Sequence, residues 1–98
     1  MKAFACGAAV VGLALAPVPA AHADDASYLA AVRALGFAQS DAYLIKGGHS
    51  VCTLMTEGHS PDELTNRIMS TSGAAAAPAH QLVVLSVHEY CPQFNDRV

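Results

Sequence analysis

The N-terminal segment limits the folding part of this chain to the residues that follow Ala23. A lysine at position 2 precedes a long apolar run, and Ala21-His22-Ala23 has the A-x-A pattern of a signal-peptidase site. We therefore expect residues 1–23 to be a signal peptide that is cleaved between Ala23 and Asp24. Residues 24–98 suffice for one small domain but are too few for a two-domain enzyme with a nucleotide-binding fold.

The alternative for the leader is a retained membrane anchor. The charge-free run from Ala3 to Ala21 approaches the roughly 20 residues that span a bilayer. The run is mostly Ala, Gly and Val, and Pro17 and Pro19 are expected to leave the backbone extended before the cleavage site. This composition favours cleavage, and hence a secreted or cell-envelope protein with no membrane span after processing.

The charge balance excludes two classes of partner. The whole chain has five Lys and Arg residues against eight Asp and Glu residues, for a formal net charge of −3. Loss of the leader removes Lys2 and makes the mature chain more acidic. Nucleic-acid binding and polybasic membrane binding both need a dense positive patch, so neither is expected.

The pattern of apolar residues predicts an all-α fold, a small bundle of about four short helices. Apolar residues recur at steps of three and four in four segments, which turn residues separate. The first segment follows Asp24-Asp25 and ends at Gly36, and the second begins at Ser40 or Asp41 and ends at Gly58. The third begins at a capping box formed by Ser60 and Glu63, and the fourth runs from Pro78 to Cys91.

Three stretches of the mature chain leave their conformation open. The Gly47-Gly48 pair costs about 1 kcal/mol per glycine inside a helix, so it marks either a kink or the close approach of another backbone. Residues 74–77 are all alanine and form either a linker or a frayed helix start. The tail from Asn95 to Val98 has little to anchor it.

Two cysteines remain after cleavage, Cys52 and Cys91, and they have one possible intramolecular pairing. Export places them in an oxidising compartment, and a domain this small often needs a covalent staple, so we expect a disulfide. The alternative is a zinc site, because His49-x-x-Cys52 and His88-x-x-Cys91 together supply a Cys₂His₂ ligand set. Zinc requires both sulfurs as thiolates, so the two interpretations exclude each other at any moment.

No catalytic residue and no cofactor can be predicted from the sequence. The segment Gly48-His49-Ser50-Val51-Cys52 resembles G-x-S-x-G only superficially, because the last glycine is missing and the context is helical. Glu57, Glu63 and Glu89 could supply an acid–base pair, but no sequence feature brings two of them together. An enzyme is therefore not expected, and an exported hydrolase is the least favoured function.

Three short motifs resemble the signature of the domain of unknown function 732, a family of small exported proteins from mycobacteria and their relatives. They are the segment from Gly48 to Cys52, the turn Gly58-x-Ser60-Pro61 and the terminal Tyr90-Cys91-Pro92. The likeness extends from about Tyr28 to Gln93. It implies a compact helical domain whose two cysteines are joined. No activity is known for the family, so no catalytic residue can be transferred.

These observations favour a secreted, non-catalytic binding module or an envelope-associated protein. An extracellular or envelope protein is the first choice of partner, and a small apolar ligand held between helices is another. A binding module is expected to expose an apolar groove with aromatic side chains such as Tyr43 or Phe94.

Overall fold

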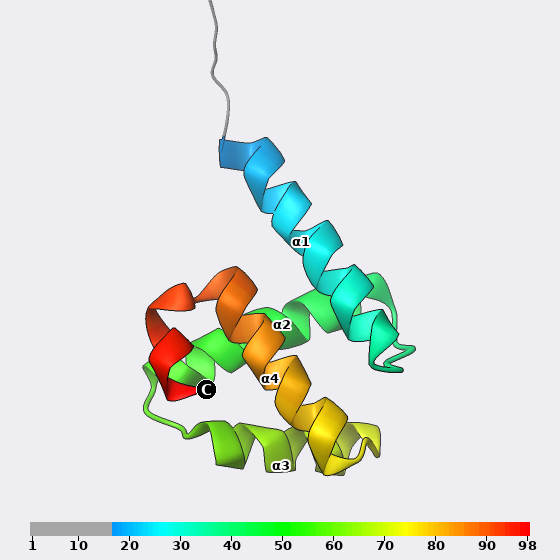
Figure 1. Cartoon of the computed structure of the whole chain (residues 1–98), viewed down its shortest axis with the longest axis vertical. Helices are drawn as coiled ribbons and strands as arrows, with labels where there is room; N and C mark the ends of the chain where they lie inside the picture. Colours follow the sequence, from blue (N-terminus) through cyan, green and yellow to red (C-terminus); the bar gives the residue numbers. More distant parts are fainter. Residues whose placement is uncertain (1–16) are drawn as a thin grey trace, which may run out of the picture.

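The computed structural model describes residues 17–98, with side chains from Asp25 onward, and it confirms the expected all-α fold. Within this range there are no strands. Residues 1–16 of the expected signal peptide lie outside the described residues. Cleavage between Ala23 and Asp24 stays a prediction. No helix of residues 17–98 is both long enough and apolar enough to cross a membrane. Four α-helices are followed by one 3-10 helix: α1 (Pro17–Ala34), α2 (Asp41–Thr56), α3 (Pro61–Ser72), α4 (Ala76–Tyr90) and η2 (Pro92–Arg97) (Figure 1).

Helix α1 begins earlier than the sequence suggested. It starts at Pro17 and continues through Asp24-Asp25, so the expectation of extended backbone around Pro17 and Pro19 is wrong for this structure. Both prolines fall in the first turn of the helix, where backbone N–H groups have no intrahelical acceptor, so proline costs no hydrogen bond there. The helix ends as expected just before Gly36, which has a φ of 103°.

Helix α2 begins with a side-chain cap. The Ser40 hydroxyl accepts a hydrogen bond from the Tyr43 backbone N–H at 3.2 Å, so Ser40, not Asp41, is the N-cap residue. The helix stops before Gly58, whose φ is 99°. Its buried residues follow one another at steps of four, three and four: Leu44, Gly48, Val51 and Met55.

Helix α3 forms half of the predicted capping box. The Ser60 hydroxyl accepts a hydrogen bond from the Glu63 backbone N–H at 3.2 Å, and Pro61 occupies the first helical position. The Glu63 carboxylate does not close the box. It lies 2.7 Å from Nδ1 of His59 instead.

Helix α4 is the central helix of the bundle and packs against the other three α-helices (Figure 1). It begins at Ala76, two residues before the expected start at Pro78. Proline is tolerated in the first turn of a helix, so Ala76, Ala77 and Pro78 form that turn, and Ala74 and Ala75 precede the helix. The buried residues of α4 are Ala79, Leu82, Val83, Ser86 and Val87.

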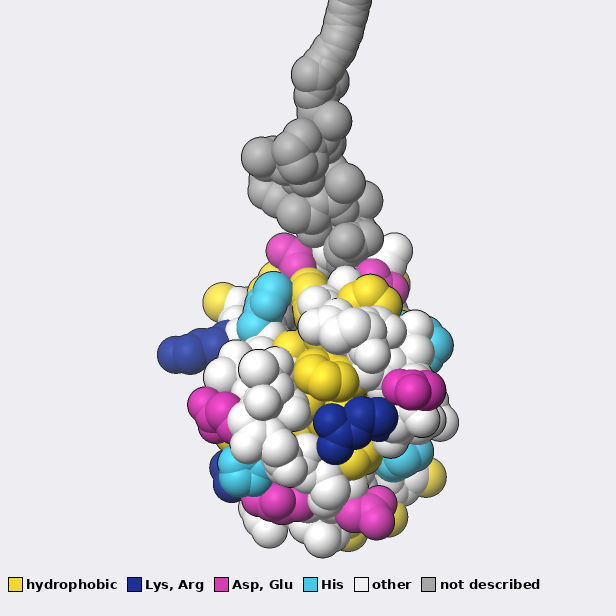
Figure 2. Space-filling model, turned by 90° about the vertical axis from the view of Figure 1, so that its left-hand side faces the viewer, with side chains coloured by type: hydrophobic (Ala, Val, Ile, Leu, Met, Phe, Trp, Pro, Cys, Tyr) yellow, Lys and Arg dark blue, Asp and Glu magenta, His cyan; other side chains and the backbone are white. Residues whose placement is uncertain are grey.

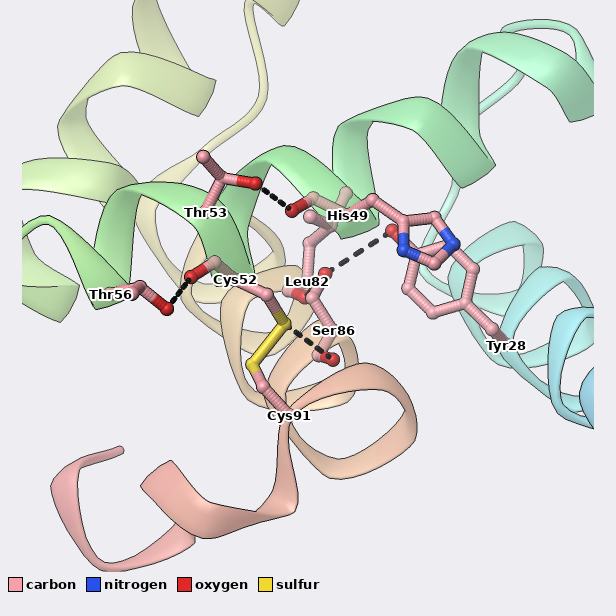
Figure 3. The surroundings of a disulfide bond; sticks show 8 residues. All are labelled: Tyr28, His49, Cys52, Thr53, Thr56, Leu82, Ser86 and Cys91. Atoms are coloured by element: carbon pink, nitrogen blue, oxygen red, sulfur yellow. Dashed lines mark hydrogen bonds between the residues drawn. A yellow bond between two sulfur atoms is a disulfide. The ribbon is translucent and has the colours of Figure 1, made fainter.

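A disulfide joins Cys52 in α2 to Cys91 at the end of α4, as expected (Figure 3). The two Cα atoms lie 5.9 Å apart, and Cys91 is buried within the hydrophobic core. The cysteines are 39 residues apart in the sequence. Closing a loop of that length removes about 4 kcal/mol of chain entropy from the unfolded state.

The C-terminal tail is anchored, contrary to the sequence-based expectation. Residues 92–97 form the helix η2, and Phe94 and Val98 pack against the core as partly buried side chains. The Arg97 guanidinium carbon lies 5.6 Å from the centre of the Phe94 ring, a cation–π distance. Figure 2 shows the side of the molecule that carries η2, where apolar side chains form a narrow strip bordered by polar and charged ones.

Candidate ligand-binding cavity

A cavity of about 340 Å³ opens between α2 and α3 and reaches α1 and α4. Its deeper lining is apolar and includes Phe37, Leu44, Val51 and Leu82, which are all buried members of the core. The remaining lining residues belong to the helix faces and to the turn before α2: Tyr28, Gln39, Tyr43, Lys46, Gly47, Ser50, Ile68, Thr71 and Ser72.

Helix α2 supplies one face of the cavity through a regular spacing. Tyr43, Lys46, Gly47 and Ser50 follow one another at steps of three, one and three, which places them on one side of an α-helix. Gly47 leaves room in this face, because a Cβ built there would meet no other atom within 4 Å. The cavity therefore depends partly on a missing side chain.

An aromatic side chain lies exposed beside the cavity. Tyr43 is 57% exposed and is the large hydrophobic residue that the described domain leaves most open to solvent. Phe37, by contrast, is buried and contributes to the inner lining. Phe94, the other aromatic residue that the sequence suggested for a binding surface, packs under Arg97 away from this cavity.

One buried polar atom in the cavity lining lacks a hydrogen-bond partner within residues 25–98. Among the described residues, the Gln39 side-chain oxygen has no hydrogen-bond partner, although that atom is buried. Gln39 also lines a neighbouring hollow of about 530 Å³, between the α1–α2 turn and the α3–α4 turn. A buried acceptor without a donor is costly, so an occupant with a hydroxyl or N–H group would be favoured here.

At Gly48, α2 packs closely against two tyrosines, one of which, Tyr28, also lines the cavity. We call Tyr28, Gly48 and Tyr90 the tyrosine cluster. The two rings meet edge to face, with their centres 5.1 Å apart. A Cβ on Gly48 would lie 2.8 Å from Tyr90 Cε2 and 2.9 Å from Tyr28 Cζ. Gly48 is thus required by the close approach of two side chains, whereas the sequence suggested a kink or the close approach of another backbone.

Buried polar contacts hold the cluster in place. Ser86 Oγ donates to the Leu82 carbonyl oxygen at 2.7 Å and lies 3.3 Å from the Tyr28 hydroxyl (Figure 3). Burial raises the pKa of Tyr28, and the Ser86 contact offsets part of that increase. The Tyr90 hydroxyl donates to Asp25 Oδ1 at 2.5 Å, and burial together with this carboxylate raises the pKa of Tyr90. Both hydroxyls therefore stay protonated at neutral pH and link α1 to α4.

Comparison with known proteins places the chain in a family of unknown function. The family model described as "Protein of unknown function (DUF732)" matches residues 23–93. The chain belongs to this family.

Two relatives of the DUF732 domain come from mycobacteria. One is "Uncharacterized protein Mb1323c" from Mycobacterium bovis, and the other is "Uncharacterized protein MT1330" from Mycobacterium tuberculosis. Each is 34% identical over 91 residues, which cover 89% of this chain and 82% of the relative. No solved structure matches the chain.

In this DUF732 domain the two histidines of the alternative zinc site have other surroundings. The His49 ring stacks on Tyr90 with the ring centres 4.0 Å apart, and His88 is exposed on α4. Cys52 and Cys91 are joined to each other, and disulfide sulfurs are not thiolate ligands. Within the part of the chain that the structure describes, no three His, Cys, Asp or Glu side chains are grouped to hold a metal ion.

The turn between α2 and α3 brings together two carboxylates that the sequence did not connect. Glu63 lies 2.7 Å from His59 Nδ1, and Glu57 lies 3.9 Å from His59 Nε2. The hydrogen bond from His59 is the main cause of the lowered pKa of Glu63, and Arg67 lowers it further. The carboxylates approach opposite ring nitrogens, so they are not placed to share one metal ion. The spacing of four residues between His59 and Glu63 could have indicated this helix-start contact.

Proposed function

We propose that this DUF732 domain is a non-catalytic binding module that acts at or outside the cell envelope. Its binding site is the cavity between α2 and α3, which holds an apolar group of the ligand. The observation that carries the proposal is the cavity itself, with its apolar inner lining and the exposed Tyr43 ring beside it.

The size and lining of the cavity support a ligand rather than a packing defect. Ligand pockets typically have volumes of about 300–1,000 Å³, are mostly apolar and carry a few polar groups that fix orientation. This cavity has about 340 Å³ and an apolar core-facing lining, and its polar lining residues include Gln39, Ser50 and Thr71. Each Å² of apolar surface that an occupant removes from water contributes about 25 cal/mol.

A fluorescence titration with the neutral probe N-phenyl-1-naphthylamine tests the proposal on the disulfide-bonded mature domain. We expect saturable enhancement of the probe's fluorescence. Gly47→Leu should abolish it, because the new side chain extends into the cavity from a position with free space around it. The same change removes a helix-interior glycine, which costs about 1 kcal/mol relative to better helix formers. Loss of binding would then accompany unchanged or increased stability.

Gln81→Leu is the matched control, because Gln81 is exposed on α4 and does not line the cavity. It adds the same hydrophobic group elsewhere and should leave the titration unchanged. Equal fluorescence enhancement by the wild type and the Gly47→Leu variant would mean that the probe binds somewhere else, and the cavity would lose its proposed role.

A protein partner that inserts an apolar side chain into the same cavity is the second candidate. The exposure of Tyr43 favours it, because tyrosine is enriched at protein interfaces relative to other surfaces. Tyr43→Ala should then weaken the protein complex by a larger factor than it weakens binding of N-phenyl-1-naphthylamine. Equal effects on both would favour the free ligand.

The proposed location rests on the N-terminal sequence pattern and has its own test. We expect the mature protein to begin at Asp24, after the A-x-A site that ends at Ala23. Intact-mass analysis of protein from culture medium measures this directly. Recovery from membranes alone, with residues 1–23 still attached, would support the retained anchor instead.

A further inference from the structure

One residue supplies the charge in the cavity lining. Lys46 is the single charged side chain among the cavity-lining residues. The whole chain is acidic, with a formal net charge of −3. The cavity lining therefore carries a positive charge, although the protein as a whole is negatively charged.

The other Lys and Arg side chains of residues 25–98 have partners, and Lys46 differs from all of them. Arg33 forms an ion pair with Asp41, and Arg67 forms one with Glu63. Arg97 lies over the Phe94 ring. Across the same residues, Lys46 has neither an ion pair nor an aromatic partner, so its ammonium group is free to meet an anion.

We infer that the ligand is an amphiphile with an anionic group, whose apolar part fills the cavity while its negative charge pairs with Lys46. This inference rests on the proposed function and names the ligand class for the same site. Asp41, the acidic residue in the first turn of α2, is already paired with Arg33 and does not compete for Lys46.

The geometry of a lysine suits this role. Its four-carbon stem can cover apolar surface while its ammonium group stays in water, where it attracts an anion without losing hydration. Exposed ion pairs typically contribute about 0.2–1 kcal/mol, which corresponds to roughly a 1.4- to fivefold change in affinity. The Lys46 charge is therefore expected to favour anionic over neutral amphiphiles. The apolar cavity is expected to supply most of the affinity.

Competition between N-phenyl-1-naphthylamine and a matched pair of amphiphiles tests the inference. Octanoate and octanol have chains of equal length and differ in their head group. Lys46→Gln should raise the Kd of octanoate about two- to fivefold and leave the Kd of octanol unchanged. Added salt should reduce the effect, because exposed charges are screened. Arg97→Gln removes an equal charge away from the cavity and should change neither Kd.

The outcomes separate this inference from the function on which it rests. Displacement of the probe by both amphiphiles, with the octanoate Kd unchanged by Lys46→Gln, would overturn the anionic ligand class and keep the cavity as the binding site. Displacement by octanol alone would also overturn it. Absence of probe binding to the wild-type domain would overturn the proposed function and the inference together.

Discussion

The two sides of α2 differ in how completely they are packed. Toward α4, the helix presents Gly48 and Cys52, which are held by two tyrosine rings and a disulfide. Toward α3, it presents Tyr43, Lys46 and Gly47 beside a cavity of about 340 Å³. The difference indicates that close packing fixes one side of α2, and we propose that the open apolar surface on the other side holds a ligand.

The neighbouring glycines of α2 show the same difference at the scale of one side chain. A Cβ on Gly48 would come within 3.0 Å of both tyrosine rings, whereas a Cβ on Gly47 would meet nothing within 4 Å. Gly48 is therefore a packing requirement of the tyrosine cluster. Gly47 has no packing reason to be glycine, and its small size keeps the cavity open.

Breaking the disulfide should have the largest effect on the closely packed side. Reduction, or the paired change Cys52→Ser with Cys91→Ser, should lower the free energy of unfolding by about 2–5 kcal/mol, because the unfolded chain regains loop entropy. Urea unfolding with and without reductant measures this, and a chelator should have no effect. Unchanged stability on reduction, or two free thiols with stoichiometric metal in the secreted protein, would favour the zinc alternative with His49 and His88.

Adding one methyl group to each glycine should have opposite effects. Gly48→Ala forces overpacking that costs about 1–3 kcal/mol, and the helix-propensity gain of about 1 kcal/mol offsets only part of it. Gly47→Ala should stabilise the domain by up to about 1 kcal/mol, because the gain meets no steric cost. Urea midpoints of the two variants provide the comparison. Equal shifts of the same sign would show that the two sides of α2 do not differ in packing.

The titration of the two clustered tyrosines should give a smaller effect. Burial raises the pKa of Tyr28 and Tyr90 above the ordinary value of 10.0, so the folded state holds these protons more tightly than the unfolded state. Their contribution to stability is complete below pH 10 and falls as the pH rises through the raised values.

Tyrosinate absorbance of a Tyr43→Phe variant reports on Tyr28 and Tyr90 alone, since the chain has three tyrosines. We expect both to ionise above pH 10. Ionisation of either group at pH 10 in the folded domain would contradict the buried tyrosine cluster.

Local signals in the sequence sufficed for most of the fold but not for the site. Ser40, Ser60, Gly36 and Gly58 set helix ends through short-range contacts, so their roles follow from the residues themselves. Pairing of Cys52 with Cys91 followed from there being one possible partner. The helix starts at Pro17 and Ala76 were missed, because proline and alanine occur both in a first helical turn and in the segment before a helix. Neither residue type therefore marks where the helix begins.

Contacts between distant residues could not be predicted from spacing. Tyr90 meets Asp25 across 65 positions, and Ser86 meets Tyr28 across 58. The cavity likewise is lined by the turn before α2 and by residues of all four helices. A space between helices produces no periodic pattern in the sequence of any one helix. The spacing of Tyr43, Gly47 and Ser50 along α2 was visible, but it indicated only that they share a helix face.

Chemical-shift mapping of the isotope-labelled mature domain with octanol tests the central claim most directly, namely that the cavity side of α2 binds and the α4 side does not. The account predicts the largest backbone amide shifts at Gly47, Ser50 and Thr71, which line the cavity, with small shifts at Cys52 and Cys91. Shifts centred on the disulfide, or spread evenly over the surface at saturating octanol, would contradict it.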